Sequence, residues 1–267
     1  MHILVSNDDG VDAPGIAALA DAVSGLGEVH VVAPAVERSA VGHAITLFEP
    51  LWVHRVKRLG EDWATAVSGT PADCVKLAVQ ALLPEPPALV LSGINRGANT
   101  GINVIYSGTV SAATEGTILG IPSIAVSIAS YSFGDYEAAS WIVRTLAEDV
   151  LRNGLPTGTL LNVNVPPLPK NEIRGVRLTR QGHARFAESF DERRDPRDRV
   201  YFWMAGRRDD GPEPPGSDET AVRDGYISIS PLHYDLTDWR ALAALPERWS
   251  GLNVEVAPDL PAASEGP

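Results

Sequence analysis

Five short apolar segments, which show little alternation with polar residues, most constrain how this chain can fold. They cover 3–6, 29–33, 88–91, 123–128 and 160–165. Segments with helical features separate them, which is typical of a parallel sheet buried by helices on both faces. We therefore predict an α/β fold with a mostly parallel, doubly wound sheet.

The helical segments carry recognisable start signals. Helices are expected at 14–23, 110–119 and 136–151, with Pro14 in the first turn of the first of them. Another is expected to begin after Thr70, which can cap it, with Asp73 at the third helical position.

The amino-acid composition changes after Pro169. Residues 185–224 are rich in Arg, Asp, Gly and Pro, and they predict an excursion, a long β-hairpin with a mobile tip. A strand at 226–230, a helix at 236–249 and a disordered tail from Pro258 follow. We expect a single domain over 1–267: a core of about 1–180, a hairpin excursion of about 181–230, and a C-terminal helix and tail of about 231–267.

Charge and cysteine content restrict the function. The net charge of −12 disfavours nucleic acid duplexes as partners, so an anionic substrate would need a local cation at its site. Cys74 is the only cysteine, which excludes a disulfide framework, and its apolar surroundings predict a buried structural thiol. No apolar run reaches the ~18 residues that a spanning helix needs. We expect a soluble, cytoplasmic protein with no membrane partner.

Short polar side chains follow three of the predicted strands. The first strand runs into Asp8 and Asp9, Ser39 lies in the stretch after the second, and Asn95 follows the strand at 88–91. Ligands of open parallel sheets bind beyond the carboxyl ends of the strands, so these side chains are expected to face one crevice.

Two adjacent aspartates at this edge require an explanation. Carboxylates a few ångströms apart repel by roughly 4 kcal/mol at an effective dielectric of about 20, and a divalent cation offsets this. Oxygen ligands select Mg²⁺, Mn²⁺ or Ca²⁺. A simple turn in which Asp9 caps the next helix explains the Asp8-Asp9-Gly10 sequence equally well, but Ser39 and Asn95 at neighbouring strand ends favour a metal site.

A second polar segment opens the helix at 110–119. Ser107, Gly108 and Thr109 offer two hydroxyls and the free amides of a helix N-terminus, which suits a phosphate group. An ordinary serine cap is the alternative. Arg38 and Arg96 are candidate phosphate contacts, and His43 is interpreted as a structural or rim residue. The Walker and dinucleotide-binding patterns are both missing from the sequence.

Several of these segments together resemble the survival protein E (SurE) family of nucleotidases, in order along nearly the whole chain. The matching stretches are ILVSNDDG, VVAPAVERSAVGHAIT, SGTPADCVKLAV, LVLSGINRGANTG, YSGTVSAATEGTILGIPSIAVS and GYISISPLHYDLTD. One departure is visible: some relatives carry an acidic pair before YSGTV, where this chain has Ile102 and Asn103.

The resemblance implies a Rossmann-like core and hydrolysis of nucleoside monophosphates with one divalent metal ion, Mg²⁺ or Mn²⁺, or Ca²⁺ in crystals. It implies a homodimer or homotetramer built with an extended hairpin and an exchanged, or swapped, C-terminal element. Carried onto this sequence, it also assigns the site residues. The metal ligands are Asp8, Asp9, Ser39 and Asn95, of which Asp8, Asp9 and Asn95 are also catalytic, and Asn99 and Ser107-Gly108-Thr109 hold phosphate or complete the pocket.

The mechanistic hypothesis is direct attack by a metal-activated water, with the amides after Tyr106 receiving negative charge. Asp8 or Asp9 as base or nucleophile stays an alternative. A receiver-like signalling module would need an aspartate where this chain has Ser92 and Asn95. A haloacid-dehalogenase-type phosphatase would need a residue between its two aspartates.

Overall fold

The computed structural model of the protein describes residues 1–209, 211–252 and 254. Two compact units divide the chain, Met1–Leu232 and His233–Pro267. The larger contains a nine-stranded sheet with the order β3-β4-β2-β1-β5-β6-β7-β11-β8. Its strands are β1 (His2–Ser6), β2 (Glu28–Pro34), β3 (Val53–Arg58), β4 (Glu61–Val67), β5 (Leu89–Arg96), β6 (Ser123–Ile128), β7 (Thr159–Val165), β8 (Val176–Leu178) and β11 (Ile227–His233).

All neighbouring pairs from β4 across to β7 run parallel, which confirms the predicted parallel sheet. The chain builds from β1 outward to β2 and β4, then returns to the other side of β1 to add β5, β6 and β7. The strand order therefore reverses between β1 and β5. A crevice forms at such a switch point, outside the carboxyl ends of the two strands.

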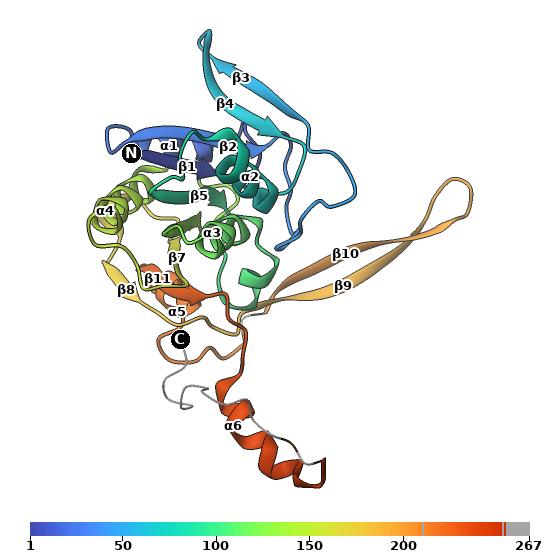
Figure 1. The fold of residues 1–267 in the computed structure, drawn as a ribbon. Coiled ribbons are helices and arrows are strands. Elements are labelled where there is room, and N and C mark those ends of the chain that lie inside the picture. Colours follow the sequence, from blue (N-terminus) through green and yellow to red (C-terminus); the bar gives the residue numbers. More distant parts are fainter. Residues whose placement is uncertain (210, 253, 255–267) are drawn as a thin grey trace. The chain divides into compact units, whose positions relative to one another are not determined.

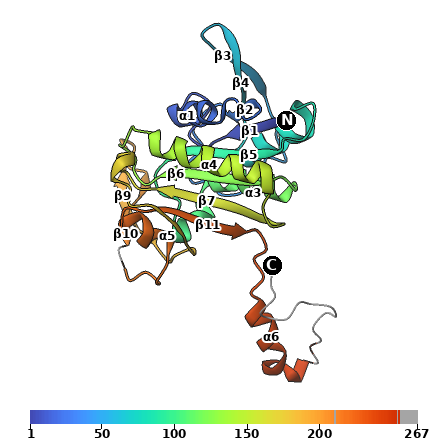
Figure 2. The ribbon, with the colours of Figure 1, turned by 90° about the vertical axis from the view of Figure 1, so that its left-hand side faces the viewer.

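Helices cover both faces of this sheet (Figures 1 and 2). On one face α1 (Pro14–Val23) and α4 (Glu137–Asn153) bury apolar side chains against Ile3 and Val5 of β1. On the other, α2 (Pro71–Leu77) and α3 (Gly108–Ile118) pack against Leu4. Alternate residues of β1 thus pack into the cores on opposite faces of the sheet, so consecutive residues of the strand are apolar rather than every second one. Shorter helical segments are η1 (Ala78–Leu82), η2 (Gly101–Tyr106), η3 (Lys170–Glu172) and α5 (Asp218–Arg223).

The start of α2 has the predicted cap. The Thr70 hydroxyl oxygen accepts the Asp73 backbone N–H at 3.1 Å, and the Asp73 carboxylate accepts the Thr70 N–H at 2.9 Å. Cys74 is fully buried, as predicted, and burial raises the pKa of its thiol far above the ordinary value.

A β-hairpin at 53–67 was not predicted. β3 pairs antiparallel with β4, and nearly all of β3 is exposed. Its charged residues break up any apolar run, so the sequence lacks the usual strand signal there.

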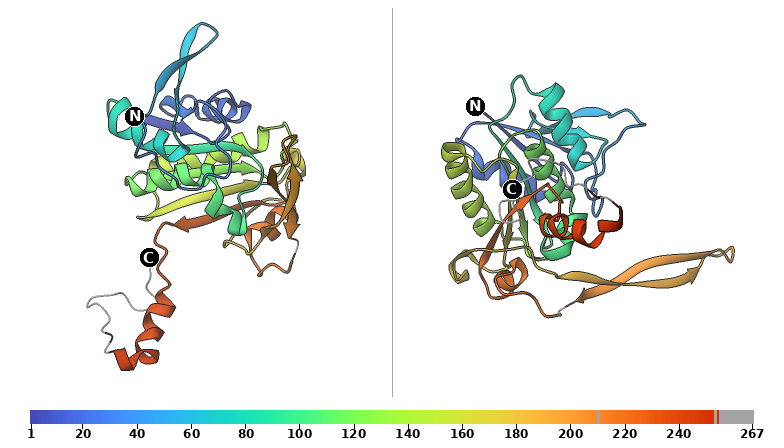
Figure 3. Two further views of the ribbon diagram at one scale, coloured as in Figure 1. Left: turned by 90° about the vertical axis from the view of Figure 1, so that its right-hand side faces the viewer. Right: turned by 60° about the horizontal axis from the view of Figure 1, so that its bottom comes forward.

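The long hairpin of the C-terminal third is confirmed (Figures 1 and 3). β9 (Arg185–Arg194) pairs antiparallel with β10 (Val200–Asp209) along its full length. The turn at 195–199 is built on the Asp195 carboxylate, which accepts the backbone N–H groups of Arg197 and Arg199. The Pro-rich run at 211–217 lies after the hairpin, where it leads to α5.

The smaller unit contains α6 (Trp239–Arg248) and η4 (Ser250–Leu252). Asp238 caps α6 by accepting the N–H groups of Arg240 and Ala241, so the helix predicted at 236–249 is confirmed. The predicted disorder from Pro258 lies outside the described residues. Among the residues that the structure describes, no helix combines the length and apolar character needed to cross a membrane.

Candidate metal centre

Asp8 and Asp9 follow β1 directly, and Asn95 lies at the end of β5, so all three stand at the switch point of the sheet. The chain after β2 reaches the same place, because the Arg38 backbone N–H donates to the Asp8 carbonyl at 2.8 Å. Ser39 is the next residue. The structure thus brings together the three segments that were predicted to meet.

Asp8 is only 6% exposed and lies against the first turn of α3. The Thr109 hydroxyl donates a hydrogen bond to its carboxylate. Gly108 packs so closely that a Cβ there would lie 2.7 Å from the Asp8 Cβ and 2.9 Å from Oδ2. The positive end of the helix therefore faces this carboxylate.

Asp9 is half-buried, and its carboxylate accepts a long 3.4 Å hydrogen bond from the Arg96 backbone N–H. It does not cap the next helix. The N-cap of α1 is Ala13, with no side-chain hydrogen bond, so the capping interpretation of Asp9 is wrong.

Asn95 and Ser39 differ in how they are held. The buried Asn95 side-chain amide donates to the Gly97 carbonyl at 2.8 Å, which leaves its amide oxygen as the atom to bind a cation. Ser39 is exposed, and its hydroxyl donates to Glu37 Oε1 at 2.5 Å rather than to either aspartate.

Protein groups offset the negative charges of the two aspartates only in part. Burial, followed by the charge of Asp9, raises the pKa of Asp8 to about 6 against the lowering effect of Thr109. Burial also raises the pKa of Asp9; the Arg96 backbone N–H and the Arg96 charge oppose the rise, and Glu37 adds to it. Within the described part of the chain, no ion pair includes either carboxylate. A buried and a half-buried carboxylate with a free amide oxygen fit a hard divalent cation.

This arrangement predicts how the metal-free protein responds to pH. The folded-state pKa of Asp8, about 6, exceeds the ordinary 3.8, so the charged carboxylate destabilises the fold fully above pH 6 and not at all below pH 4. With EDTA present, the stability advantage of Asp8→Asn over wild type should grow by roughly 3 kcal/mol between pH 4 and pH 7.5. Urea unfolding measures it, and an advantage independent of pH would contradict the assignment.

Asn99 lies in a network of buried amides. Its backbone N–H donates to Asn164 Oδ1 at 2.8 Å, and its side-chain amide donates to Ser127 at 2.9 Å. Asn162 and Asn164 both donate to its carbonyl. Sequence analysis missed these two asparagines of β7. Their i, i+2 spacing within an otherwise apolar buried strand was the available signal.

The residues after Asn99 are anchored by α5. The Thr100 hydroxyl donates to Glu219 at 2.7 Å, and the Gly101 N–H donates to Asp218 at 2.9 Å. Asp218 is fully buried and also accepts the Gly182 N–H at 2.9 Å. The loop that carries Asn99 is therefore fixed by residues far along the chain.

The predicted phosphate segment is partly engaged within the protein. Ser107 caps α3 by accepting the Val110 N–H at 3.0 Å, which leaves its hydroxyl proton available for a ligand. The Thr109 hydroxyl is bonded to Asp8. Ser107 thus acts as an ordinary helix cap and still has a hydroxyl proton to donate, whereas the Thr109 hydroxyl is used to hydrogen-bond Asp8.

Of the other polar residues considered, Arg38 donates to the Ser68 carbonyl at 2.7 Å, and Arg96 is exposed beside Asp9. His43 contacts the buried Glu115 of α3 at 2.8 Å, and Lys76 pairs with the same carboxylate at 2.5 Å. This geometry supports a structural role for His43: it ties the loop containing Ser39 to α3.

Glu115→Gln should therefore destabilise the protein by about 2 kcal/mol, because it leaves the Lys76 ammonium and the His43 ring facing a neutral buried side chain. Thermal or urea unfolding measures the loss. The matched control is Glu148→Gln, which removes an exposed i, i+4 pair with Arg144 and should cost under about 0.5 kcal/mol. Equal effects of the two substitutions would refute the buried-pair interpretation.

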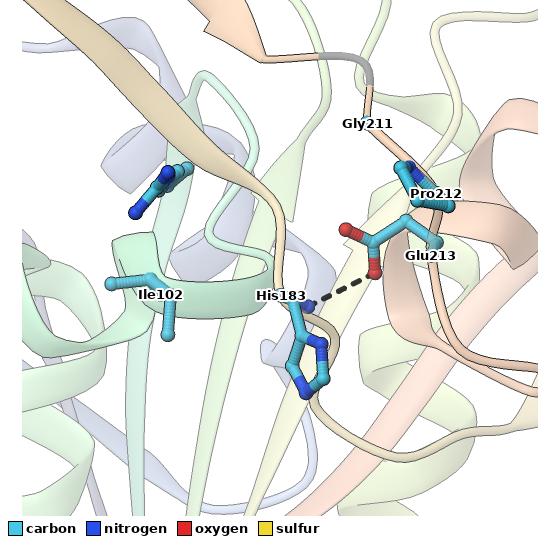
Figure 4. Close-up of a pocket in the computed structure, with 6 residues that line it drawn as sticks. Ile102, His183, Gly211, Pro212 and Glu213 are labelled. Atoms are coloured by element: carbon cyan, nitrogen blue, oxygen red, sulfur yellow. Dashed lines mark hydrogen bonds between the residues drawn. The ribbon is translucent and has the colours of Figure 1, made fainter.

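A separate pocket of about 310 Å³ lies at the base of the β9–β10 hairpin (Figure 4). There Glu213 accepts the backbone N–H of His183 at 3.0 Å. Ile102 of η2 lines it too. None of the predicted metal or phosphate residues lines this pocket, so it is not the candidate centre.

Comparisons with known proteins match most of the chain. The family described as Survival protein SurE matches residues 3–188. The 5'-nucleotidase SurE of Syntrophobacter fumaroxidans (strain DSM 10017 / MPOB) is 51% identical over 248 residues, covering 92% of this chain and 98% of that protein. The 5'-nucleotidase SurE of Moorella thermoacetica is 52% identical over 240 residues, covering 90% and 92%.

Among solved structures, the crystal structure of the SurE protein from Aquifex aeolicus superposes with a TM-score of 0.80 at 40% identity. The match covers 93% of this chain and all of that one. The same α/β architecture is thus present in both proteins. Neither the receiver-like nor the haloacid-dehalogenase alternative gains support from these comparisons.

Proposed function

The chain belongs to the SurE family, and on this premise we propose that it is a metal-dependent phosphomonoesterase that hydrolyses nucleoside monophosphates, a 5'/3'-nucleotidase. The observation that carries the proposal is a pair of carboxylates, one buried and one half-buried, at the switch point beside the N-terminus of α3, where burial raises the pKa of both. Relatives at about 50% identity named 5'-nucleotidase supply the substrate class.

In this proposal one divalent ion, Mg²⁺ or Mn²⁺, is held by Asp8, Asp9, Asn95 and Ser39. When bound, the ion would polarise a phosphoryl oxygen and lower the pKa of a water molecule. Ser39 would have to turn from Glu37 to take part, since its hydroxyl donates to that carboxylate. The three other residues lie at the carboxyl ends of β1 and β5, which are neighbouring parallel strands.

The chain's own groups then bind and orient the phosphate. The first turn of α3 offers the amide of Gly108 and the hydroxyl proton of Ser107. Asn99 adds a side chain that donates to Ser127, while the amides of β7 hold its backbone. Thr109 keeps Asp8 in place by hydrogen bonding. These donors are preorganised, so they can stabilise negative charge as it develops on the phosphoryl oxygens.

A panel of phosphate esters tests this function. The metal-stripped protein should release phosphate from nucleoside 5'- and 3'-monophosphates on addition of Mg²⁺ or Mn²⁺ and be inactive in EDTA. Glycerol phosphate serves as the comparison substrate without a base. Full turnover after exhaustive chelation, or no turnover of any nucleotide with either ion, would refute the proposal.

The route of hydrolysis is tested separately. We propose direct attack by water, because Asp8 and Asp9 are both occupied as ligands. In ¹⁸O-labelled water the released phosphate should contain one labelled oxygen, and rapid acid quenching should trap no phosphoprotein. A trapped acyl phosphate on Asp8 or Asp9 would establish the covalent route instead.

We also propose assembly into a homodimer or homotetramer in the cytoplasm through the β9–β10 hairpin, with exchange of the C-terminal element. The hairpin exposes apolar side chains, which are Phe190, Tyr201, Phe202, Trp203 and Met204. Phe190, Phe202 and Met204 share one face of the hairpin, and Tyr201 and Trp203 share the other. Exposed apolar side chains gathered in this way are typical of an interface. Light scattering should give a mass of two or four chains, and Phe202→Glu with Met204→Glu should lower it; a monomeric wild type would contradict the proposal.

A further inference from the structure

Two histidines and a glutamate meet at the amino ends of β1 and β2. His2 is the first residue of β1 and Glu28 the first residue of β2, and their Cα atoms are partners in the parallel pair. His30 lies two residues after Glu28. Because side chains alternate along a strand, Glu28 and His30 share one face of the sheet.

The potential ligand atoms of these three side chains lie close together. His2 Nδ1 and His30 Nε2 are 2.9 Å apart, and each lies 3.5 Å from a Glu28 carboxylate oxygen. All lie within 4.8 Å of one another, and no other such group of three histidine, cysteine or acidic side chains occurs among the described residues.

These separations match those around a tetrahedral zinc ion. With Zn–N bonds of about 2.0–2.1 Å at tetrahedral angles, two ligand nitrogens lie roughly 3.3 Å apart. The observed distances bracket that value. Two imidazoles and one carboxylate are a ligand set that zinc uses with a fourth position open to water. Glu28 is exposed and His30 lines a pocket of about 280 Å³, so an ion has access.

We propose that His2, Glu28 and His30 bind a zinc ion at the amino edge of the sheet. The ion would join β1 to β2 with water as its fourth ligand. This site is distinct from the centre at Asp8, because His2 begins β1 and Asp8 follows its other end; the four steps from His2 to Ser6 alone span roughly 13 Å. Imidazole ligands also select a different class of metal from the oxygen ligands at the carboxyl edge.

The simpler reading is a hydrogen bond between two histidines beside an exposed carboxylate, with no affinity for metal. A zinc titration separates the two readings. The protein, without a polyhistidine tag, is treated with EDTA, desalted, and titrated with Zn²⁺ by calorimetry in excess Mg²⁺, which keeps the hard-cation centre occupied.

We expect one zinc per wild-type chain. Mutation of a residue that only hydrogen-bonds to a zinc ligand typically weakens zinc binding by ~10–100-fold. His30→Gln removes a ligand itself, so it should weaken zinc binding by at least about 100-fold. Glu28→Gln, at a 67% exposed position, is the second variant if His30→Gln fails to fold. The matched control is His54→Gln, an exposed histidine on β3, which should bind zinc like wild type.

Two readouts separate this site from the hydrolytic centre. His30→Gln should keep full nucleotide hydrolysis, and Asp8→Asn should keep the zinc isotherm. Co²⁺ bound to wild type should give the strong visible absorption of a tetrahedral site, absent in His30→Gln. The proposal is overturned if wild type binds no zinc in excess Mg²⁺, or if His30→Gln and Glu28→Gln bind it as wild type does.

Discussion

Asp8→Asn should lower nucleotide hydrolysis by roughly 10³-fold at saturating Mn²⁺. The substitution keeps the shape of the side chain and one oxygen, but it removes the negative charge that is closest to the first turn of α3. Affinity for Mn²⁺ should fall with it, because a neutral amide is a weaker ligand for a hard cation. Phosphate release and a calorimetric Mn²⁺ titration measure the two effects.

The matched control is Asp12→Asn, at an exposed aspartate in the same loop, which should leave both quantities within about twofold of wild type. Removal of a buried charge should not unfold Asp8→Asn, since burial is what raises the pKa of that carboxyl. If the variant hydrolysed nucleotides at the wild-type rate while folded, Asp8 would have no part in the chemistry.

Gly108→Ala should lower the rate by ~100-fold and lower the free energy of unfolding by roughly 1–3 kcal/mol. A Cβ at this position meets the Asp8 side chain at 2.7 Å and Pro71 Cγ at 3.1 Å, so either the carboxylate or the helix must move. Displacement of a reacting group by about 1 Å is enough for a loss of this size. Steady-state kinetics should place the loss in kcat, since the amides that bind phosphate remain.

Gly134→Ala is the comparison for this substitution. Nothing lies within 4 Å of a Cβ at Gly134, so the same methyl group adds no clash there. We expect its rate to match wild type. Equal rates for the two alanine variants would show that α3 does not press on Asp8.

Much of the centre was predictable because it depends on strand ends. Asp8 and Asn95 follow apolar runs that could be identified in the sequence, and parallel strands place their carboxyl ends at one edge. The helix start at Thr70 was equally readable, since a capping box is a local pattern. For these features, neighbours along the chain carry the information.

The rest depends on contacts between distant segments. Thr109 and Asp8 are 101 positions apart in the sequence. The residues around Thr109 do not indicate that its hydroxyl donates a hydrogen bond to a carboxylate rather than to a phosphate. The sequence around Glu115 does not indicate that this carboxylate is buried against His43 and Lys76, which lie far away along the chain. The role of Asp9 was ambiguous for the opposite reason, because the local pattern fits a helix cap that the fold does not form.

The anchoring of Thr100 and Gly101 by α5 limits how small a working version of this enzyme can be. A chain cut after position 188, where the match to the family ends, would still contain every predicted ligand and phosphate-binding residue. It would lack Asp218 and Glu219, and with them the acceptors that hold the loop after Asn99. Such a truncated protein would contain the proposed site residues but would lose the hydrogen bonds from α5 that fix the loop carrying Asn99.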